Sequence, residues 1–132
     1  MLVPYLIGMV NCDGTVAYIQ CRSPQSPRDV RQTLKRHYSD PNKLERLMRL
    51  GDIHTLGAIP RPLAGDGIGG EAENARGCLV CGYPGARSAA SPGTFLKKAA
   101  TGGVGFAYLY ACGTWMGWAG CTWLPMERLQ RF

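Results

Sequence analysis

The sequence of 132 residues lacks the features that would assign it to a class at once. No apolar run approaches the ~20 residues that a membrane-spanning helix needs. Dense negative charge is also missing: the formal net charge is +6, which excludes a protein that acts by imitating DNA. A hydrophobic share of 45% excludes a wholly disordered chain. The sequence contains no internal repeat and no complete catalytic signature, so it names no reaction.

We also expect no export signal in the first residues of the chain. The first ten residues are apolar, but they lack a basic segment, contain Pro4 and run directly into a turn-forming stretch at 11–14. We therefore expect them to form the first strand of a cytoplasmic protein. In such a reducing compartment, we expect the six cysteines to be thiols or metal ligands before they are disulfides.

Glycine and proline, by contrast, are abundant, with 18 and 9 residues, and they predict much turn and loop. A chain of this length fits a single domain, residues 1–132, and a second core would be cramped. Residues 60–77 are so rich in glycine that we expect a flexible loop. The spacing Gly65-x-Gly67-x-x-Gly70 matches the dinucleotide-binding fingerprint in form only, because no strand leads into it and an acidic loop follows.

The strand signals are two hairpins and one short run. Residues 3–10 and 15–21 are β-favouring runs separated by an Asp-Gly turn, which is a strong hairpin signal. A second hairpin, rich in aromatic residues, is expected at 106–119 around the Cys112-Gly113 turn. A short strand is expected at 78–81.

Two short basic helices are expected after the first hairpin. Ser26 and Asp40 are each followed by proline, the pattern of an N-cap with proline at the first helical position. Apolar residues then recur at helical spacing and would be buried: Val30, Leu34 and Tyr38, then Leu44, Leu47 and Met48. Further helical turns are expected at 94–100 and 125–130. The fold class predicted is α+β, an antiparallel sheet of about four to five strands packed with two to four short helices, in the order ββααβαββ(α).

Aromatic residues alternate along the second hairpin. Phe106, Tyr108 and Tyr110 share one face of their strand, and Leu109 lies on the other. If the Leu109 face packs against the core, the three rings form an exposed platform for bases or for a protein partner. Otherwise the aromatic residues belong to the core and rim of the sheet, together with Trp115, Trp118 and Trp123.

Positive charge is concentrated on the two basic helices. Residues 22–49 carry eight Lys or Arg against three Asp or Glu, which is nearly all of the net charge. Such a patch favours an anionic partner, either a nucleic-acid backbone or an acidic protein surface, and the alternative is a solvated face that aids solubility. The residues expected to contact the partner are Arg31, Lys35, Arg36, Lys43, Arg46, Arg49 and Tyr38.

The cysteine spacing is compatible with a zinc site. Cys78 and Cys81 have the CxxC spacing of zinc ligands, and Cys112 with Cys121 would complete a four-sulfur site. However, eight residues separate the second pair, which is wider than the usual ligand spacing. The alternatives are free thiols, with no cofactor, and a redox pair, although a redox CxxC should open a helix and Gly82 follows here instead.

Three segments together carry a resemblance: His37 to Asp40, Leu50 to Gly57, and Tyr108 to Trp115, with Asp52 to Gly57 the most specific piece. Their order resembles a family of small accessory proteins of prophages and plasmids, over most of the chain but not over residues 58–76. In those relatives the strand after the loop carries charged residues. The cysteine-flanked strand of this chain therefore argues against an inherited metal site.

Proteins of this size from mobile elements are often inhibitors of host defence, anti-CRISPR proteins among them. The resemblance thus implies a non-enzymatic phage protein in the host bacterial cytoplasm. It would bind and inhibit a defence protein or ribonucleoprotein complex of the CRISPR-Cas type, away from the membrane. Two alternatives remain: a nucleic-acid-binding module, with or without a Cys-ligated zinc, and a small thiol enzyme. The enzyme would pair Cys12 or Cys21 with a histidine, His37 or His54, but no flanking signature supports it.

Overall fold

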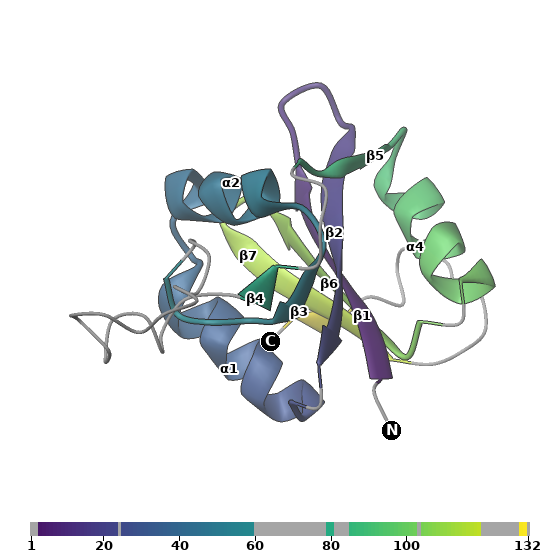
Figure 1. Ribbon diagram of the computed structural model, residues 1–132. Helices are drawn as coiled ribbons and strands as arrows, with labels where there is room; N and C mark the ends of the chain where they lie inside the picture. Colours follow the sequence, from purple (N-terminus) through teal and green to yellow (C-terminus); the bar gives the residue numbers. More distant parts are fainter. Residues whose placement is uncertain are drawn as a thin grey trace.

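The computed structural model describes residues 3–23, 25–59, 79–80, 85–102, 104–119 and 130–131. A mixed β-sheet forms the middle layer, with helices α1 (Pro27–His37) and α2 (Pro41–Leu50) on one face and helix α4 (Pro92–Thr101) on the other (Figure 1). None of the helices in these residues is long and apolar enough to cross a bilayer.

Within the described residues, eight strands form one sheet in the order β4-β3-β2-β1-β6-β7-β8, and β5 pairs with β2 outside this path. The strands are β1 (Val3–Val10), β2 (Val16–Ser23), β3 (Ile53–Thr55), β4 (Leu79–Val80), β5 (Arg87–Ala89), β6 (Phe106–Ala111), β7 (Thr114–Ala119) and β8 (Gln130–Arg131). The α+β class is therefore confirmed. The sheet has more strands than expected, because the additional strands span only two or three residues each and are too short to give a pattern in the sequence.

The prediction of an antiparallel sheet is wrong, because the sheet is mixed. Strand β6 pairs in parallel with β1, from Tyr5 opposite Phe106 to Met9 opposite Tyr110, and β3 pairs in parallel with β2. The cause is the connections: α1 and α2 lie between β2 and β3, and α4 precedes β6. A chain that crosses a sheet through helices returns parallel to an earlier strand.

Both predicted hairpins are confirmed. Strands β1 and β2 pair antiparallel in register from Val3 opposite Ser23 to Val10 opposite Val16, and β6 pairs antiparallel with β7. The second hairpin turns at Cys112 and Gly113, with φ of 51° and 76°. Positive φ at both central residues is the geometry whose twist suits a two-residue hairpin.

The helices begin where the sequence indicates. The Ser26 hydroxyl accepts the Asp29 N–H at 3.2 Å at the start of α1, and the Asp40 carboxylate accepts the Asn42 N–H at 3.0 Å at the start of α2. The helix expected at 94–100 is α4, which Ser91 caps by accepting the Thr94 N–H at 3.1 Å. The Gly-rich loop expected at 60–77 and residues 125–129 of the expected last helical turns lie outside the described residues, and Gln130 begins β8.

The central strands are buried on both faces. The side chains of Tyr5, Ile7, Tyr108 and Tyr110 pack under α1 and α2, whereas Leu6, Ala107 and Leu109 pack under α4 with Phe95 and Leu96. Tyr108 and Tyr110 are 4% and 7% exposed, so they do not form a platform. Trp115 and Trp118 are also buried, which confirms a core role for them, and Trp123 lies outside the described residues.

Candidate binding surface on the two basic helices

Helix α1 is fixed to the sheet at both ends by buried aromatic side chains. Near its start, the Tyr5 hydroxyl donates to the Gln25 carbonyl, and the Tyr108 hydroxyl donates to the Pro27 carbonyl at 3.1 Å. Just past its end, the Trp115 indole donates to the Tyr38 carbonyl at 3.2 Å. The aromatic face that was a candidate for an exposed platform therefore anchors the basic helix α1 through hydrogen bonds.

Burial raises the pKa of the Tyr108 hydroxyl well above that of an ordinary tyrosine, and the neighbouring Tyr5 adds to the rise. The Arg31 guanidinium opposes this rise in the pKa. Tyr108 therefore stays a neutral donor, and the anchor of α1 persists across the physiological pH range.

Most of the predicted contact residues project into solvent. Arg31, Lys35 and Arg36 are exposed on α1, and Arg46 and Arg49 are exposed on α2. Because α1 and α2 cover the same face of the sheet (Figure 1), we call these five residues the basic surface. Among the described residues, no salt bridge engages Lys35, Arg36 or Arg46.

The other two predicted contact residues are less accessible. Lys43 is half-buried, with its ammonium 5.3 Å from the centre of the Tyr38 ring. Tyr38 is fully buried, so its prediction as a contact residue is wrong. It continues the apolar stripe of Val30 and Leu34, and its hydroxyl donates to the Gly57 carbonyl at 2.6 Å. Its role is to attach the end of α1 to the segment that follows β3.

One cation of the basic surface already has an acidic partner. Arg49 and Glu45 are 3.1 Å apart, one helical turn from each other, with side chains 73% and 55% exposed. A pair this exposed contributes less than about 1 kcal/mol to stability. Arg49 can therefore exchange this partner for another carboxylate at little cost.

The segment that carries the resemblance, Asp52 to Gly57, has a structural role. The Gln25 side chain donates to the Leu56 carbonyl and accepts the Leu56 N–H, both at 3.0 Å. The Asp52 carboxylate accepts the Gln20 N–H at 3.0 Å and forms an ion pair with Arg87. These contacts hold the segment against β2, β5 and the connection that leads into α1.

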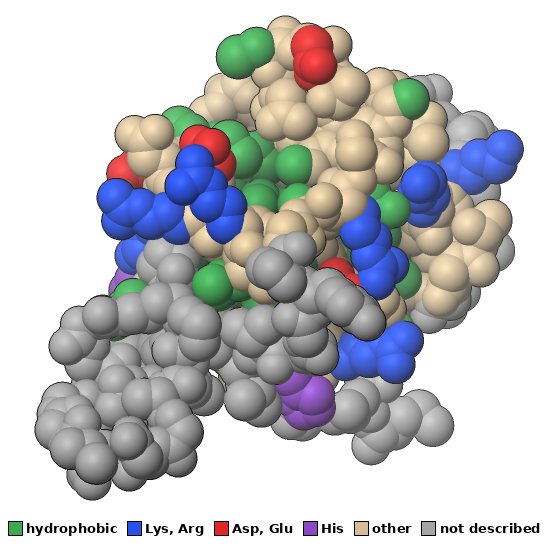
Figure 2. Space-filling model, turned by 45° about the horizontal axis from the view of Figure 1, so that its top comes forward, with side chains coloured by type: hydrophobic (Ala, Val, Ile, Leu, Met, Phe, Trp, Pro, Cys, Tyr) green, Lys and Arg blue, Asp and Glu red, His purple; other side chains and the backbone are tan. Residues whose placement is uncertain are grey.

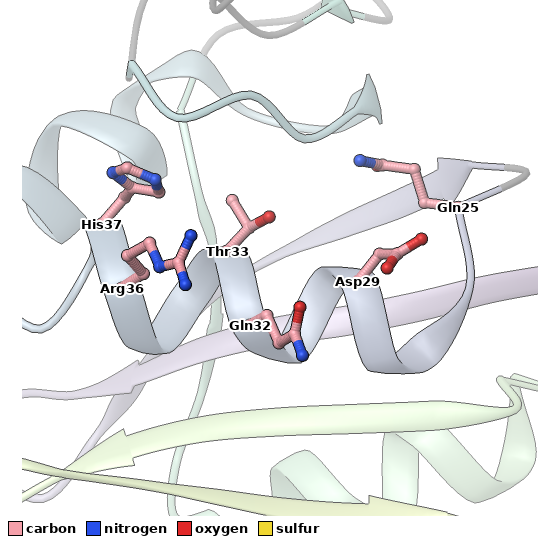
Figure 3. A pocket seen from close by; sticks show the side chains of 6 residues that line it. All are labelled: Gln25, Asp29, Gln32, Thr33, Arg36 and His37. Atoms are coloured by element: carbon pink, nitrogen blue, oxygen red, sulfur yellow. The ribbon is translucent and has the colours of Figure 1, made fainter.

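A polar groove of about 340 Å³ runs along α1 at the edge of the basic surface. Figure 3 shows five of its side chains along the helix and Gln25 just before it. The lining residues are Gln25, Asp29, Gln32, Thr33, Arg36 and His37. Of these, only Arg36 was expected at the site, because the sequence could place a residue on a helix face but could not place Gln25 beside it.

Cations also lie outside the basic surface. On the face in Figure 2, Lys and Arg form several separate groups, with Asp or Glu beside two of them. Arg22 and Arg87 line a second hollow of about 220 Å³ together with Asp52, and Lys97 and Lys98 are exposed on α4. The positive charge is therefore distributed around the molecule, with its densest exposed run on α1.

The cysteines give no metal centre in the part of the chain that the structure describes. Cys12 and Cys112 are exposed at the two hairpin turns, and Cys21 is buried with its thiol 3.9 Å from the His54 carbonyl oxygen. No group of three or more potential ligands occurs among the described residues. The remaining members of the proposed zinc set, Cys78, Cys81 and Cys121, lie outside them.

Comparison with known proteins adds no relative. No protein-family model, no curated protein and no solved structure matches the chain. Its function must therefore be inferred from its own side chains and their placement.

Proposed function

We propose that this protein is a non-enzymatic binding protein that docks its basic surface against an acidic surface of a partner protein. One observation carries the proposal: Lys35 and Arg36 are exposed, without a salt bridge among the described residues, on a helix anchored at both ends. A rigid helix holds its cations in place before the partner arrives, which lowers the entropic cost of binding.

The distribution of acidic residues favours a protein partner over nucleic acid. Asp29, Asp40 and Glu45 are exposed among the cations of α1 and α2. They would repel a continuous row of phosphates, whereas a protein surface can meet both signs of charge. Stacking on bases is also disfavoured, because Tyr108 and Tyr110 are buried and Phe106 is half-buried.

The class of partner follows from the resemblance to prophage and plasmid accessory proteins. We propose a host defence protein or ribonucleoprotein complex, of the CRISPR-Cas type among others, which the chain inhibits by occupying an acidic surface. Complementary charge would speed the encounter, and bidentate pairs from arginines such as Arg36 and Arg46 to carboxylates would slow release.

The proposal is tested by matched charge reversals on opposite faces. Arg36→Glu on α1 and Lys97→Glu on α4 change the net charge equally, and both side chains are exposed. Tagged variants would be expressed in the host, and co-purified proteins would be quantified by mass spectrometry. We expect one specific partner to be depleted about tenfold by Arg36→Glu, equivalent to roughly 1.4 kcal/mol, and retained by Lys97→Glu.

Equal depletion by both variants would contradict docking through α1. A partner that is lost after nuclease treatment, together with oligonucleotide affinity that falls steeply with salt, would instead support the nucleic-acid-binding alternative.

A further inference from the structure

We infer that the groove beside α1 recognises an extended peptide segment of the partner, with an acidic side chain on Arg36 and a hydrogen-bond donor on Asp29. This inference rests on the proposed function and specifies which part of the partner the surface reads. It is carried by the charge at the two ends of the groove, by the polar lining between them and by the spacing of the ends.

The two ends of the groove have opposite charge. Asp29 and Arg36 are seven residues apart on α1, which corresponds to about 10 Å along a helix. Both side chains are exposed, and neither the carboxylate nor the guanidinium forms a hydrogen bond or ion pair among the described residues. A ligand that satisfies both ends must therefore carry an acceptor and a donor about 10 Å apart.

The wall between the two ends suits a peptide backbone. Gln32 and Thr33 offer amide and hydroxyl groups, which can pair with the N–H and C=O groups of an extended chain. The Gln25 side chain is held in place, because its amide nitrogen donates to the Leu56 carbonyl and its amide oxygen accepts the Leu56 N–H. Apart from the His37 imidazole, the described side chains that line the groove offer no ring on which a nucleobase could stack.

The polar wall and the spacing of its ends favour an extended segment over a helix. The backbone N–H and C=O groups of a helix are already paired with one another, so they could not pair with the wall. In the polyproline II conformation, an extended chain covers about 9 Å in three residues and returns its side chains to the same face at every third residue. The acidic and donor side chains would therefore be three residues apart and would both face α1.

The test uses two variants that add the same charge. Asp29→Asn and Asp40→Asn each remove one exposed carboxylate near the basic surface, but only Asp29 lines the groove. Asp40 caps α2, and asparagine caps a helix equally well. General attraction to positive charge predicts that both variants bind an acidic ligand more tightly, whereas recognition by the groove predicts that Asp29→Asn binds less tightly.

The probes are the peptides Ac-Glu-Gly-Gly-Lys-NH₂ and Ac-Glu-Gly-Gly-Glu-NH₂, titrated into the labelled full chain and followed by amide NMR shifts. We expect the Glu/Lys peptide to shift the amides of Gln32 and Thr33 and to bind more tightly than the Glu/Glu peptide. Asp29→Asn should weaken it about fivefold, the upper value for an exposed charge pair, and Asp40→Asn should not. Arg36→Gln should weaken both peptides.

Two results would overturn the inference. If the Glu/Glu peptide binds more tightly, or if Asp29→Asn strengthens binding as Asp40→Asn does, general attraction explains the surface and the proposed function stands without the groove. If neither peptide shifts the groove amides, the groove is not a peptide site. The charge-reversal experiment on α1 and α4 then decides the proposed function separately.

Discussion

At the scale of single residues, Asp52 joins strands that have little pairing of their own. Strand β3 meets β2 at Cys21 opposite Ile53, and β5 meets β2 at residues 16–18. Between these pairings, the Asp52 carboxylate accepts the Gln20 N–H and pairs with Arg87 of β5. The side chain thus replaces a missing part of the ladder at this edge of the sheet.

We therefore expect Asp52→Ala to lower the free energy of unfolding by about 1–3 kcal/mol, because the Gln20 N–H is left without its acceptor. Asp52→Asn should cost less, since its amide oxygen still accepts that N–H and only the ion pair is lost. Urea unfolding of the two variants beside the wild type measures the difference. Equal costs for alanine and asparagine would contradict a role for this hydrogen bond.

A second residue-scale prediction concerns the first hairpin turn. The Asp13 carboxylate accepts the Thr15 hydroxyl at 2.6 Å and the Thr15 N–H at 3.0 Å, and these bonds lower the pKa of Asp13 below its model-compound value of 3.8. The resulting stabilisation is present above the unfolded-state pKa and is lost as the pH falls through the lowered value. Thr15→Ala should raise the pKa partway back, because the hydroxyl is the larger cause and the N–H remains.

An NMR titration of the Asp13 carboxyl carbon in both proteins measures this change. An unchanged pKa in Thr15→Ala would show that the hydroxyl does not stabilise the carboxylate.

At the scale of elements, the packing of α4 against β1 depends on one missing side chain. A Cβ at Gly8 would lie 3.0 Å from the Phe95 ring and 3.0 Å from a Val16 methyl carbon. Phe95 is fully buried and cannot move aside freely. Helix α4 can therefore approach the sheet this closely only because residue 8 is glycine.

We expect Gly8→Ala to lower the free energy of unfolding by about 1–3 kcal/mol through overpacking. Gly93 is the matched control, because a Cβ there would meet only the Ser91 hydroxyl oxygen at 3.8 Å, an ordinary contact. Gly93→Ala in the first turn of α4 should raise stability by about 0.4–1 kcal/mol. Thermal or urea unfolding measures the change in the free energy of unfolding for both variants. A stabilised Gly8→Ala variant would contradict the packing of α4 against β1.

Some helices and strands could be predicted from the sequence, and others could not. Both hairpins and the three helices among the described residues have local signals, such as the Cys112-Gly113 turn and the Ser26 and Asp40 caps. The parallel pairing of β1 with β6 has no local signal, because residues about one hundred positions apart meet there. Strands of two or three residues, such as β5, exist only because a long neighbour pairs with them.

The candidate site was predictable to a similar degree. Arg36 and Arg46 could be assigned to exposed faces because they lie off the apolar stripes of their helices. Tyr38 was misassigned because a tyrosine at a stripe position can either be buried or reach a partner, and only the fold places Gly57 within reach of its hydroxyl. The groove depends on the contact between Gln25 and Leu56, which are 31 positions apart.

At the scale of the whole molecule, each layer of the fold has a different role. A sheet buried on both faces anchors α1 through aromatic hydroxyl and indole groups, and α1 and α2 present the basic surface to solvent (Figure 1). Helix α4 closes the opposite face and carries Lys97 and Lys98. The two sides of one molecule therefore provide a test surface and a control surface of the same charge sign.

The most direct measurement places a photo-crosslinking amino acid at Gln32 on α1 and, in a second variant, at Lys97 on α4, both exposed positions. After irradiation in host cells, we expect a discrete protein adduct from position 32, lost when Arg36→Glu is added, and no such adduct from position 97. An adduct from position 97 alone, or one from position 32 that survives Arg36→Glu, would contradict docking through the basic surface.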